Sequence, residues 1–421
     1  MSLPQGAFMD RRRFIRSAAL AAAAALPLSA SLAAMRSDLR ITRVRVFNPV
    51  NTTTLAGPLG LSEIVVAVDT NAGITGYGQG GTPDLLRYAA SLLIGQDPLR
   101  IEYLWQRMYR SSIYPAGRER LHAVGALDCA LWDIKGKLLD VPVYQLLGGR
   151  ARDYIECYKS YGPMRPEVAR SEARKTVEEG YKAIRVFSIA GAGSSFDTRR
   201  GIDALVSLCT DLREGAGPAG EFICDAHTRF DYADALHLCE RLAPLSPLFV
   251  EDPLRQMDDY TLFARLRART SVPLAAGEQF GELRDGNLPL VEQGLIDYLR
   301  SSIPNVGGIT GYRKLAALCE AHSVAMVPHF TGPIATAAVV HALLSVPMPV
   351  INEAYKTELP AYLKAGIDFR NGRMYPVDRP GLGVTVDEQR LNPIAQFTQP
   401  RPPELYQGES FARPDGSHLY L

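Results

Sequence analysis

Two kinds of hydrophobic pattern divide the chain. Between residues 39 and 77, three short runs alternate apolar and polar positions and are separated by turn residues, which predicts an antiparallel meander. Apolar residues then recur every three or four positions in 83–94, 98–110 and 118–139, as they do on one face of a helix. From residue 153 onward, eight short apolar runs alternate with helical segments. This alternation predicts parallel strands joined by helices.

Eight strand-like runs favour a closed barrel over an open doubly wound sheet. We therefore predict an α/β fold: a modified TIM-type (β/α) barrel over residues 151–367, preceded by an α+β capping domain over 35–150. Residues 368–421 return to turn-rich sequence and are expected to pack back on the capping domain, completing it. A length of 421 residues agrees with two domains, or with one barrel that carries additions.

Residues 1–34 have the layout of an export signal. Three consecutive arginines, Arg11, Arg12 and Arg13, precede an alanine-rich apolar run and a Ser-Leu-Ala sequence, which is typical of a twin-arginine signal. The apolar run is too short to span a bilayer, and we expect Met9 to be the native start. The sequence therefore predicts a periplasmic protein with no membrane segment in its mature form.

Composition excludes some functions. Apolar residues make up 47% of the chain and charged residues 22%, as in ordinary soluble enzymes, and a net charge of +1 offers no basic field for nucleic acid. The six cysteines are scattered singly, without a CxxC pair, and we expect them to be free and buried.

Three acidic residues follow successive predicted strands. Asp225, Glu251 and Glu278 end the runs FICD, LFVE and PLAAGE and are spaced 26 and 27 residues apart, about one strand–helix unit each. Carboxylates at the same ends of neighbouring barrel strands meet in one mouth. Hard oxygen ligands in that arrangement predict one Mg²⁺ per site.

Other polar residues end the remaining strands. His227 shares a face with Asp225 because strand side chains alternate, while His329 ends the seventh strand and Glu353 the eighth. A metal on carboxylates can bind a substrate carboxylate and stabilise the enolate formed when the neighbouring C–H loses its proton. His329 and His227 are then candidates for the base and the acid.

The chain resembles the enolase superfamily, in its mandelate racemase/muconate lactonizing enzyme branch, over nearly all of its mature length. The matching motifs are GITGYG, ALDCALWDIKGK, PVYQLLGG, NVGGIT and PGLGV, together with the three strand-end acids. The resemblance implies a capping domain on a modified barrel, with Asp225, Glu251 and Glu278 as metal ligands. Asp-x-His on the third strand is most similar to sugar-acid dehydratases of the galactonate and mannonate type. There the residue matching His227 helps the 3-hydroxyl leave, Glu353 matches the strand-eight acid, and His329 matches the base.

Two departures from the family pattern affect this interpretation. The Lys-x-Lys of racemases is Arg185-Val186-Phe187 here, and a phenyl ring cannot move a proton. Racemisation needs acid or base groups on both faces of the substrate, so that reaction is disfavoured. Ser302 stands where the aspartate partner of the seventh-strand histidine is expected, and a serine can orient an imidazole without stabilising its charge.

We therefore predict a Mg²⁺-dependent acid-sugar dehydratase, with an epimerase or racemase, or a non-catalytic periplasmic binding protein, as alternatives. Site residues in addition to the acids and histidines are Arg185 and Ser302. The expected ligand is a small carboxylate, and the resemblance implies a homo-oligomer. Substrate-binding candidates lie in the stretch 111–120, namely Tyr114, Arg118 and Arg120.

Overall fold

The structure is a computed structural model of the 421-residue chain. It describes residues 38–49, 63–111, 117–162, 164–187, 197–281, 283–355, 357–400 and 413–417. The predicted export signal and Tyr114 lie outside these residues.

The capping domain is a four-stranded sheet covered by helices. Its strand order is β16-β1-β2-β3, so that the last of the described strands pairs antiparallel with the first of them. Every residue of β2 is buried, as expected for a strand with apolar side chains and neighbours on both edges. The strands are β1 (Ile41–Pro49), β2 (Val65–Thr70), β3 (Thr75–Gln79) and β16 (Leu391–Phe397), and the helices are α2 (Pro83–Ser91), α3 (Ile101–Tyr109), α4 (Gly117–Leu139) and α5 (Val143–Leu146).

Helix α4 lies directly on β3 because two glycines leave room for its backbone. A Cβ atom at Gly78 would lie 1.8 Å from the carbonyl oxygen of Ala126, and one at Gly76 would lie 2.1 Å from that of Ala130. Side chains at both positions would force the helix off the sheet. The GITGYG motif therefore has a packing function.

Eight parallel strands form the barrel. The sheet runs in the order β10-β9-β8-β7-β6-β5-β4, and β11 pairs with β4, while a parallel bridge between Met326 and Val350 links the two ends. An apolar cluster fills the interior, formed by Tyr158, Ala183, Ile223, Phe249, Ala275, Val327 and Ile351. The strands are β4 (Ile155–Ser160), β5 (Ala183–Phe187), β6 (Glu221–Asp225), β7 (Phe249–Glu251), β8 (Leu274–Ala276), β9 (Tyr298–Leu299), β10 (Ala325–Met326) and β11 (Asn352–Ala354).

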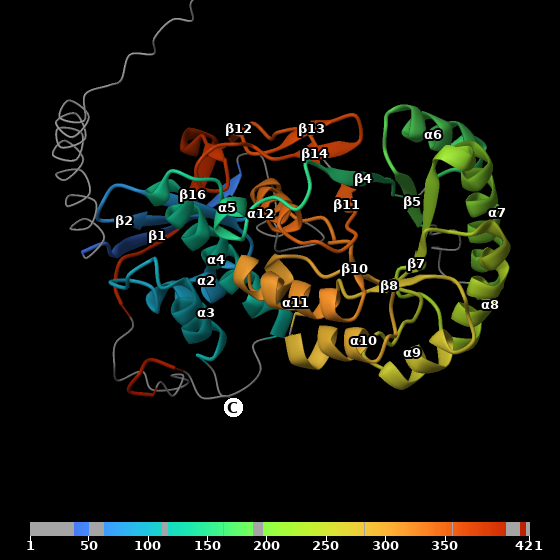
Figure 1. Cartoon of the computed structure of the whole chain (residues 1–421), viewed down its shortest axis with the longest axis horizontal. Coiled ribbons are helices and arrows are strands. Elements are labelled where there is room, and N and C mark those ends of the chain that lie inside the picture. The colour runs from blue at the N-terminus through green and yellow to red at the C-terminus, as the bar shows by residue number, and fades with distance from the viewer. Residues whose placement is uncertain are drawn as a thin grey trace, which may run out of the picture.

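Helices surround the barrel, and Figure 1 shows α6 to α9 on its outer side and the capping domain at the opposite end of the molecule. Helix α12 is buried along its whole length from Ile334 to Leu344, because it contacts β4 of the barrel as well as β3, α4 and α5 of the capping domain. The barrel helices are α6 (Pro166–Glu178), α7 (Thr198–Ala216), α8 (Tyr232–Leu242), α9 (Tyr260–Arg267), α10 (Leu288–Glu292), α11 (Ile309–Ala321) and α12 (Pro333–Leu344). Short strands near the C-terminus are β12 (Leu363–Ala365), β13 (Asp368–Arg370), β14 (Arg373–Tyr375) and β15 (Thr385–Val386).

Hydrogen bonds attach α4 to the start of α11. The buried carboxylate of Asp128 accepts hydrogen bonds from the backbone N–H of Thr310 (2.9 Å) and from its hydroxyl (2.6 Å). Trp132 donates its indole N–H to the same hydroxyl at 2.9 Å. Asp128 thus satisfies a free N–H of the first turn of α11, a function usually performed by a residue of the same helix. A side chain on Gly308, the residue before α11, would collide with this carboxylate.

The predicted fold class is confirmed, and β16 completes the capping domain. The start of the C-terminal segment differs from the prediction, because β14 pairs antiparallel with β4 of the barrel and β13 pairs with β14. Another difference lies in β9 and β10, which have two residues each although longer runs were expected. All six cysteines are free and buried, as predicted.

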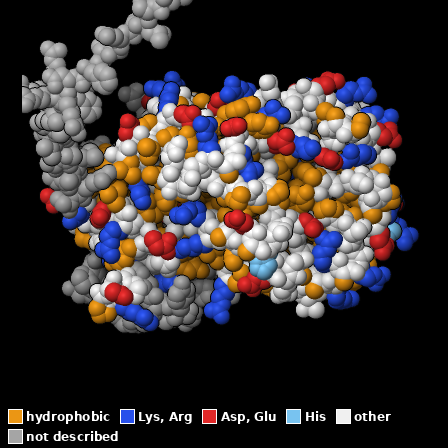
Figure 2. Space-filling model, in the orientation of Figure 1, with side chains coloured by type: hydrophobic (Ala, Val, Ile, Leu, Met, Phe, Trp, Pro, Cys, Tyr) orange, Lys and Arg blue, Asp and Glu red, His pale blue; other side chains and the backbone are white. Residues whose placement is uncertain are grey.

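The surface agrees with the low net charge. On the face in Figure 2, acidic and basic side chains are interspersed and are not separated by sign. Among the described residues, no helix is long and apolar enough to cross a bilayer.

Asp128 predicts a pH dependence of stability. Burial raises its pKa to about 7, although the bonds from Thr310 oppose the shift. The folded protein therefore holds the Asp128 proton more tightly than the unfolded chain does. The contribution of this protonated carboxyl group to the free energy of unfolding is lost as pH rises from about 4 through about 7. Relative to Asp128→Asn, the wild type should lose roughly 2–4 kcal/mol between pH 4.5 and pH 8 in urea unfolding. The exposed Asp84→Asn serves as the control, and a difference that is independent of pH would contradict the prediction.

Candidate active site

A cavity of about 480 Å³ opens at the carboxyl ends of the barrel strands, where barrel enzymes carry their sites. Helix α4 of the capping domain contributes Arg118 and His122 to its wall. The barrel contributes the remaining polar lining: Ser160, Tyr161, Arg185, His227, Glu278, Ser302, Asn305, His329, Thr331, Glu353 and Tyr355. The cavity is therefore polar on both its barrel side and its capping side.

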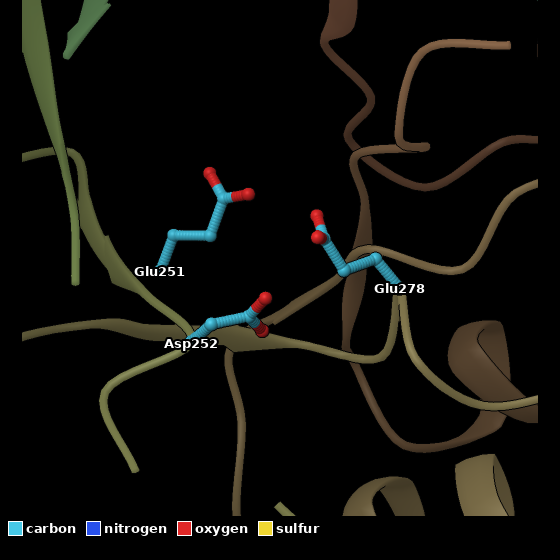
Figure 3. Close-up of side chains that lie close together, drawn as sticks. All are labelled: Glu251, Asp252 and Glu278. Atoms are coloured by element: carbon cyan, nitrogen blue, oxygen red, sulfur yellow. The ribbon is translucent and has the colours of Figure 1, made fainter. Parts of the chain in front are cut away.

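Three carboxylates converge beside this cavity. Glu251 ends β7, Asp252 follows it, and Glu278 follows β8; their oxygens come within 4.8 Å of one another (Figure 3). Neighbouring residues of a strand normally point to opposite faces, but Asp252 adopts a left-handed backbone conformation, with φ of 44°. Its carboxylate thereby joins that of Glu251. The cluster contains two members of the predicted triad, Glu251 and Glu278, whereas Asp225 is not in it.

Asp225 lies at the end of β6 and has other partners. It accepts hydrogen bonds from the backbone N–H of His227 (2.7 Å) and from Arg185, and its Oδ2 lies 3.0 Å from His227 Nδ1. Sequence reasoning missed Asp252, because it named only Glu251 at the end of this strand. The Glu-Asp pair at the strand end was the available signal.

Two buried guanidinium groups neutralise part of this negative charge. Arg185 on β5 donates through Nε to Glu251 at 2.9 Å and through Nη1 to Ser160 at 2.9 Å, in addition to its bond with Asp225. Arg185 was expected in the site. Arg300, which follows β9, was not predicted.

Arg300 is fully buried and donates hydrogen bonds to several side chains at the mouth of the barrel. It donates to Glu251 (2.8 Å), Glu278 (3.2 Å) and Glu353 (3.0 Å), and to the hydroxyl of Tyr158 (2.6 Å). A charged side chain directly after an apolar run looks like an ordinary loop residue in the sequence. Its burial is evident only once the barrel is closed.

The residues present fit a divalent cation. Five carboxylates, including Asp225 and Glu353, face two guanidinium groups, which leaves excess negative charge when all are ionised. Burial and the neighbouring Glu278 and Glu251 raise the pKa of Asp252 well above its ordinary value, and its Oδ1 has no hydrogen-bond partner within the described part of the chain. A hard cation with oxygen ligands would relieve both conditions.

The two histidines lie on the same cavity. His227 is held by Asp225 on one side, and its ring stacks on Phe187, with centroids 5.2 Å apart and planes 14° apart. The bond to Asp225 raises the pKa of His227 although partial burial opposes the shift. Phe187 thus orients the imidazole at the position where racemases carry a lysine.

His329 follows β10, and its Nε2 lies 3.8 Å from a carboxylate oxygen of Glu278. The predicted partner, Ser302, lies in the same wall, but its buried hydroxyl has no hydrogen-bond partner among the described residues. Glu278 is therefore the ion-pair partner of the imidazole among the described residues, and no hydrogen bond from Ser302 orients it.

The remaining predicted residues divide into two sets. Glu353 lines the cavity; burial alone would raise its pKa, but Arg300 and Arg185 lower it overall, so it is a carboxylate. Arg118 also lines the cavity. Arg120 does not: it donates to the hydroxyl of Ser111 (2.5 Å) and to a carbonyl oxygen within the capping domain.

Family comparisons agree with this architecture. Residues 41–148 match the mandelate racemase / muconate lactonizing enzyme N-terminal domain, and residues 168–390 match the enolase C-terminal domain-like family. The chain belongs to the mandelate racemase/muconate lactonizing enzyme branch of the enolase superfamily. The resemblance predicted from its motifs is confirmed.

The chain is similar to curated D-galactonate dehydratases and to a solved structure with bound D-gluconate. The chain is 37% identical over 340 residues to D-galactonate dehydratase of Pectobacterium atrosepticum, covering 76% of this chain and 88% of the relative. It is 38% identical over 345 residues to D-galactonate dehydratase of Variovorax paradoxus, covering 77% and 88%. The crystal structure of an enolase from Pantoea ananatis with bound D-gluconate and Mg superposes with a TM-score of 0.74 at 29% identity, covering 84% of this chain and 94% of that one.

The acidic cluster predicts a divalent-cation site in which Glu278 is a ligand. Glu278→Gln should weaken Mn²⁺ binding at least about 100-fold, because a charged oxygen ligand is lost, and the exposed Glu292→Gln should leave it unchanged. Calorimetry or Mn²⁺ electron paramagnetic resonance measures the affinity without any substrate. The same titration on Asp225→Asn and Asp252→Asn identifies the third carboxylate, and unchanged binding in Glu278→Gln would remove the cluster as the cation site.

Proposed function

We propose that this protein is a Mg²⁺-dependent acid-sugar dehydratase, a hydro-lyase that acts on aldonic or aldaric acids. One observation carries the proposal: a single cavity holds two imidazoles, His227 and His329, beside the carboxylate cluster. The galactonate dehydratase relatives and the neighbour with bound D-gluconate and Mg support the substrate class.

The carboxylates and the arginines have different functions in the site. Glu251 and Glu278, with Asp225 or Asp252, would hold Mg²⁺, which when bound supplies positive charge to a substrate carboxylate and to the enolate made from it. Arg185 and Arg300 fix the positions of these carboxylates, because each guanidinium donates to at least two of them. The site is thus organised before a substrate enters.

The histidines carry the proton steps. His329 takes the proton from C2, beside the substrate carboxylate, and the electron pair of that bond forms the enolate. The pair then forms the C2–C3 double bond as the 3-hydroxyl leaves with a proton from His227, so that water departs. The resulting enol becomes a 2-keto-3-deoxy acid. His227 suits the acid role because Asp225 raises its pKa and so favours its protonated form.

An epimerase is the second candidate, because the same two imidazoles lie in one cavity. Epimerisation would have His227 return a proton to C2 from the other face. The stacking of Phe187 on His227 and the bond of that ring to Asp225 favour a fixed acid at a departing hydroxyl. Isotope exchange distinguishes the two reactions.

We expect the two histidines to separate proton exchange from dehydration. His329→Asn should abolish both, with a loss of about 10²–10⁴-fold or more in rate, whereas His227→Asn should lose dehydration but keep exchange of the C2 proton with D₂O. The assay follows a library of aldonic and aldaric acids with Mg²⁺ by NMR, and is repeated after chelation of the metal. The exposed His237→Asn is the control. Deuterium at C2 without loss of water in the wild type would select the epimerase, and inactivity across the library with metal bound would favour a binding protein.

We also propose that residues 1–34 direct export through the twin-arginine route and that the mature protein is periplasmic. The consecutive arginines and the short apolar run support this location. Assembly as a homo-oligomer, and a contribution of Tyr114 and Arg118 to substrate binding, stay predictions.

Export should depend on the arginine pair. Replacing Arg11 and Arg12 together by lysine keeps the charge but removes the pair, so the protein should remain in the cytoplasm with its signal uncleaved. Fractionation and immunoblotting measure the distribution. Replacement of Arg16 by lysine is the matched control, and normal export of the double variant would contradict the proposal.

A further inference from the structure

Two buried histidines outside the proposed proton steps differ in one respect. His341 on α12 accepts a hydrogen bond at Nδ1 from the backbone N–H of Tyr144 (3.2 Å) and stacks on that ring. It is not part of the cavity wall. His122 on α4 is 5% exposed and lines the cavity, and its Nδ1 has no hydrogen-bond partner within the described residues.

Neighbouring bonds determine which nitrogen of His122 carries the proton. Asn305 donates its amide NH₂ to the backbone carbonyl of Glu278 at 2.6 Å, so its side-chain oxygen is free to accept. That oxygen is bonded to Nε2 of His122, which must therefore be the donor. Nδ1 is left with a lone pair. Burial, together with the positive charge of Arg118, lowers the pKa of His122 to about 4, so the ring is neutral near neutral pH.

An unpaired buried acceptor is costly. Such an atom costs about 1–3 kcal/mol unless something donates to it. Helix α4 cannot move to relieve the cost, because its Gly125 packs against the backbone of Pro304 and Gly308, and Asp128 is bonded to Thr310. A ligand group in the cavity is therefore the natural partner of Nδ1.

The chemistry of the wall narrows the class of that ligand group. A carboxylate cannot donate to Nδ1, and a methyl group would leave it unpaired. An ammonium group would be repelled by Arg118, which lies one turn earlier on α4 and also lines the cavity. Arg118 Nε is likewise buried without a partner among the described residues, and so is the hydroxyl of Thr331, which also lines the cavity. A hydroxyl group, which donates and accepts, matches an acceptor beside a donor.

We propose that His122 is a specificity-determining residue whose Nδ1 accepts a hydrogen bond from a chain hydroxyl of the acid sugar, with Arg118 donating beside it. This proposal rests on the proposed function and concerns a hydroxyl other than the one that leaves. The barrel side of the cavity then recognises the reacting end of the substrate. The capping side recognises hydroxyl groups along the rest of the acid-sugar chain.

Two substitutions separate the nitrogens of the ring. His122→Gln keeps a donor to Asn305 near the position of Nε2 but has no acceptor near that of Nδ1, whereas His122→Asn keeps an acceptor near Nδ1 and loses the contact at Nε2. For a substrate found in the acid-sugar library, kcat/KM is measured against analogues that lack one hydroxyl at C4, C5 or C6.

In the wild type, kcat/KM for one analogue should be about 10-fold to 100-fold lower than for the parent acid, since a site built to bind a hydroxyl discriminates against its absence. His122→Gln should lose that discrimination, because kcat/KM falls for the parent acid alone, mostly through a higher KM. His122→Asn should restore part of the discrimination. His341→Gln is the control and should lower thermal stability while leaving the ratio unchanged. Equal losses for parent and analogues in His122→Gln would overturn the proposal.

Binding measurements keep this test independent of turnover. Calorimetry with the same acids reports the contact even when no water is eliminated. Binding with discrimination but without turnover would overturn the dehydratase assignment and support the role of His122. Turnover with unchanged discrimination in His122→Gln would overturn only the role of His122, and failure of every acid sugar to bind would overturn both.

Discussion

Buried like charge is the constraint on which the mouth of the barrel depends. Five carboxylates brought together by strand ends would repel one another and lose hydration, and removing one partner of a buried ion pair typically costs about 3–5 kcal/mol. Arg185 and Arg300 make the arrangement tolerable because each donates to several acids at once. The same two side chains leave enough negative charge to attract a cation. The balance between the carboxylates and the two guanidinium groups therefore determines both the stability of the mouth and its attraction for a cation.

The capping domain is held to that mouth by α4. Close glycine contacts place the helix on β3, and Asp128 joins it to α11 of the barrel. The tryptophan of α3 adds a bond from Trp105 to the carbonyl of Gly307, at 2.6 Å. Side chains on α4 consequently reach the cavity from a fixed frame. The NVGGIT motif thus marks the joint between the domains as well as the start of α11.

Much of this could be predicted from the sequence. The barrel, the capping domain and the return of the C-terminal segment follow from periodicity and strand count, and strand-end register brought His227, His329, Glu278 and Glu353 to one cavity as expected. What could not be predicted depends on backbone conformation and burial. Asp252 joins the acids through a left-handed residue that alternation does not foresee, and Arg300 reads as a loop residue until the barrel closes. His122 resembled any residue of a buried helix face, since an unpaired nitrogen has no signature in a sequence.

Strand β16 has a consequence for the order of assembly. It pairs with β1 across nearly the whole length of the chain, so the sheet that begins first during synthesis gains its edge strand last. Long-range pairing of this kind is slow to form, because the entropy of closing a long loop is lost before the first hydrogen bond between the strands can form. Until residue 397 has left the ribosome, β1 keeps an unpaired edge that invites association with other chains. A transport route that accepts only finished proteins would let such a chain complete this step in the cytoplasm, before it meets the membrane.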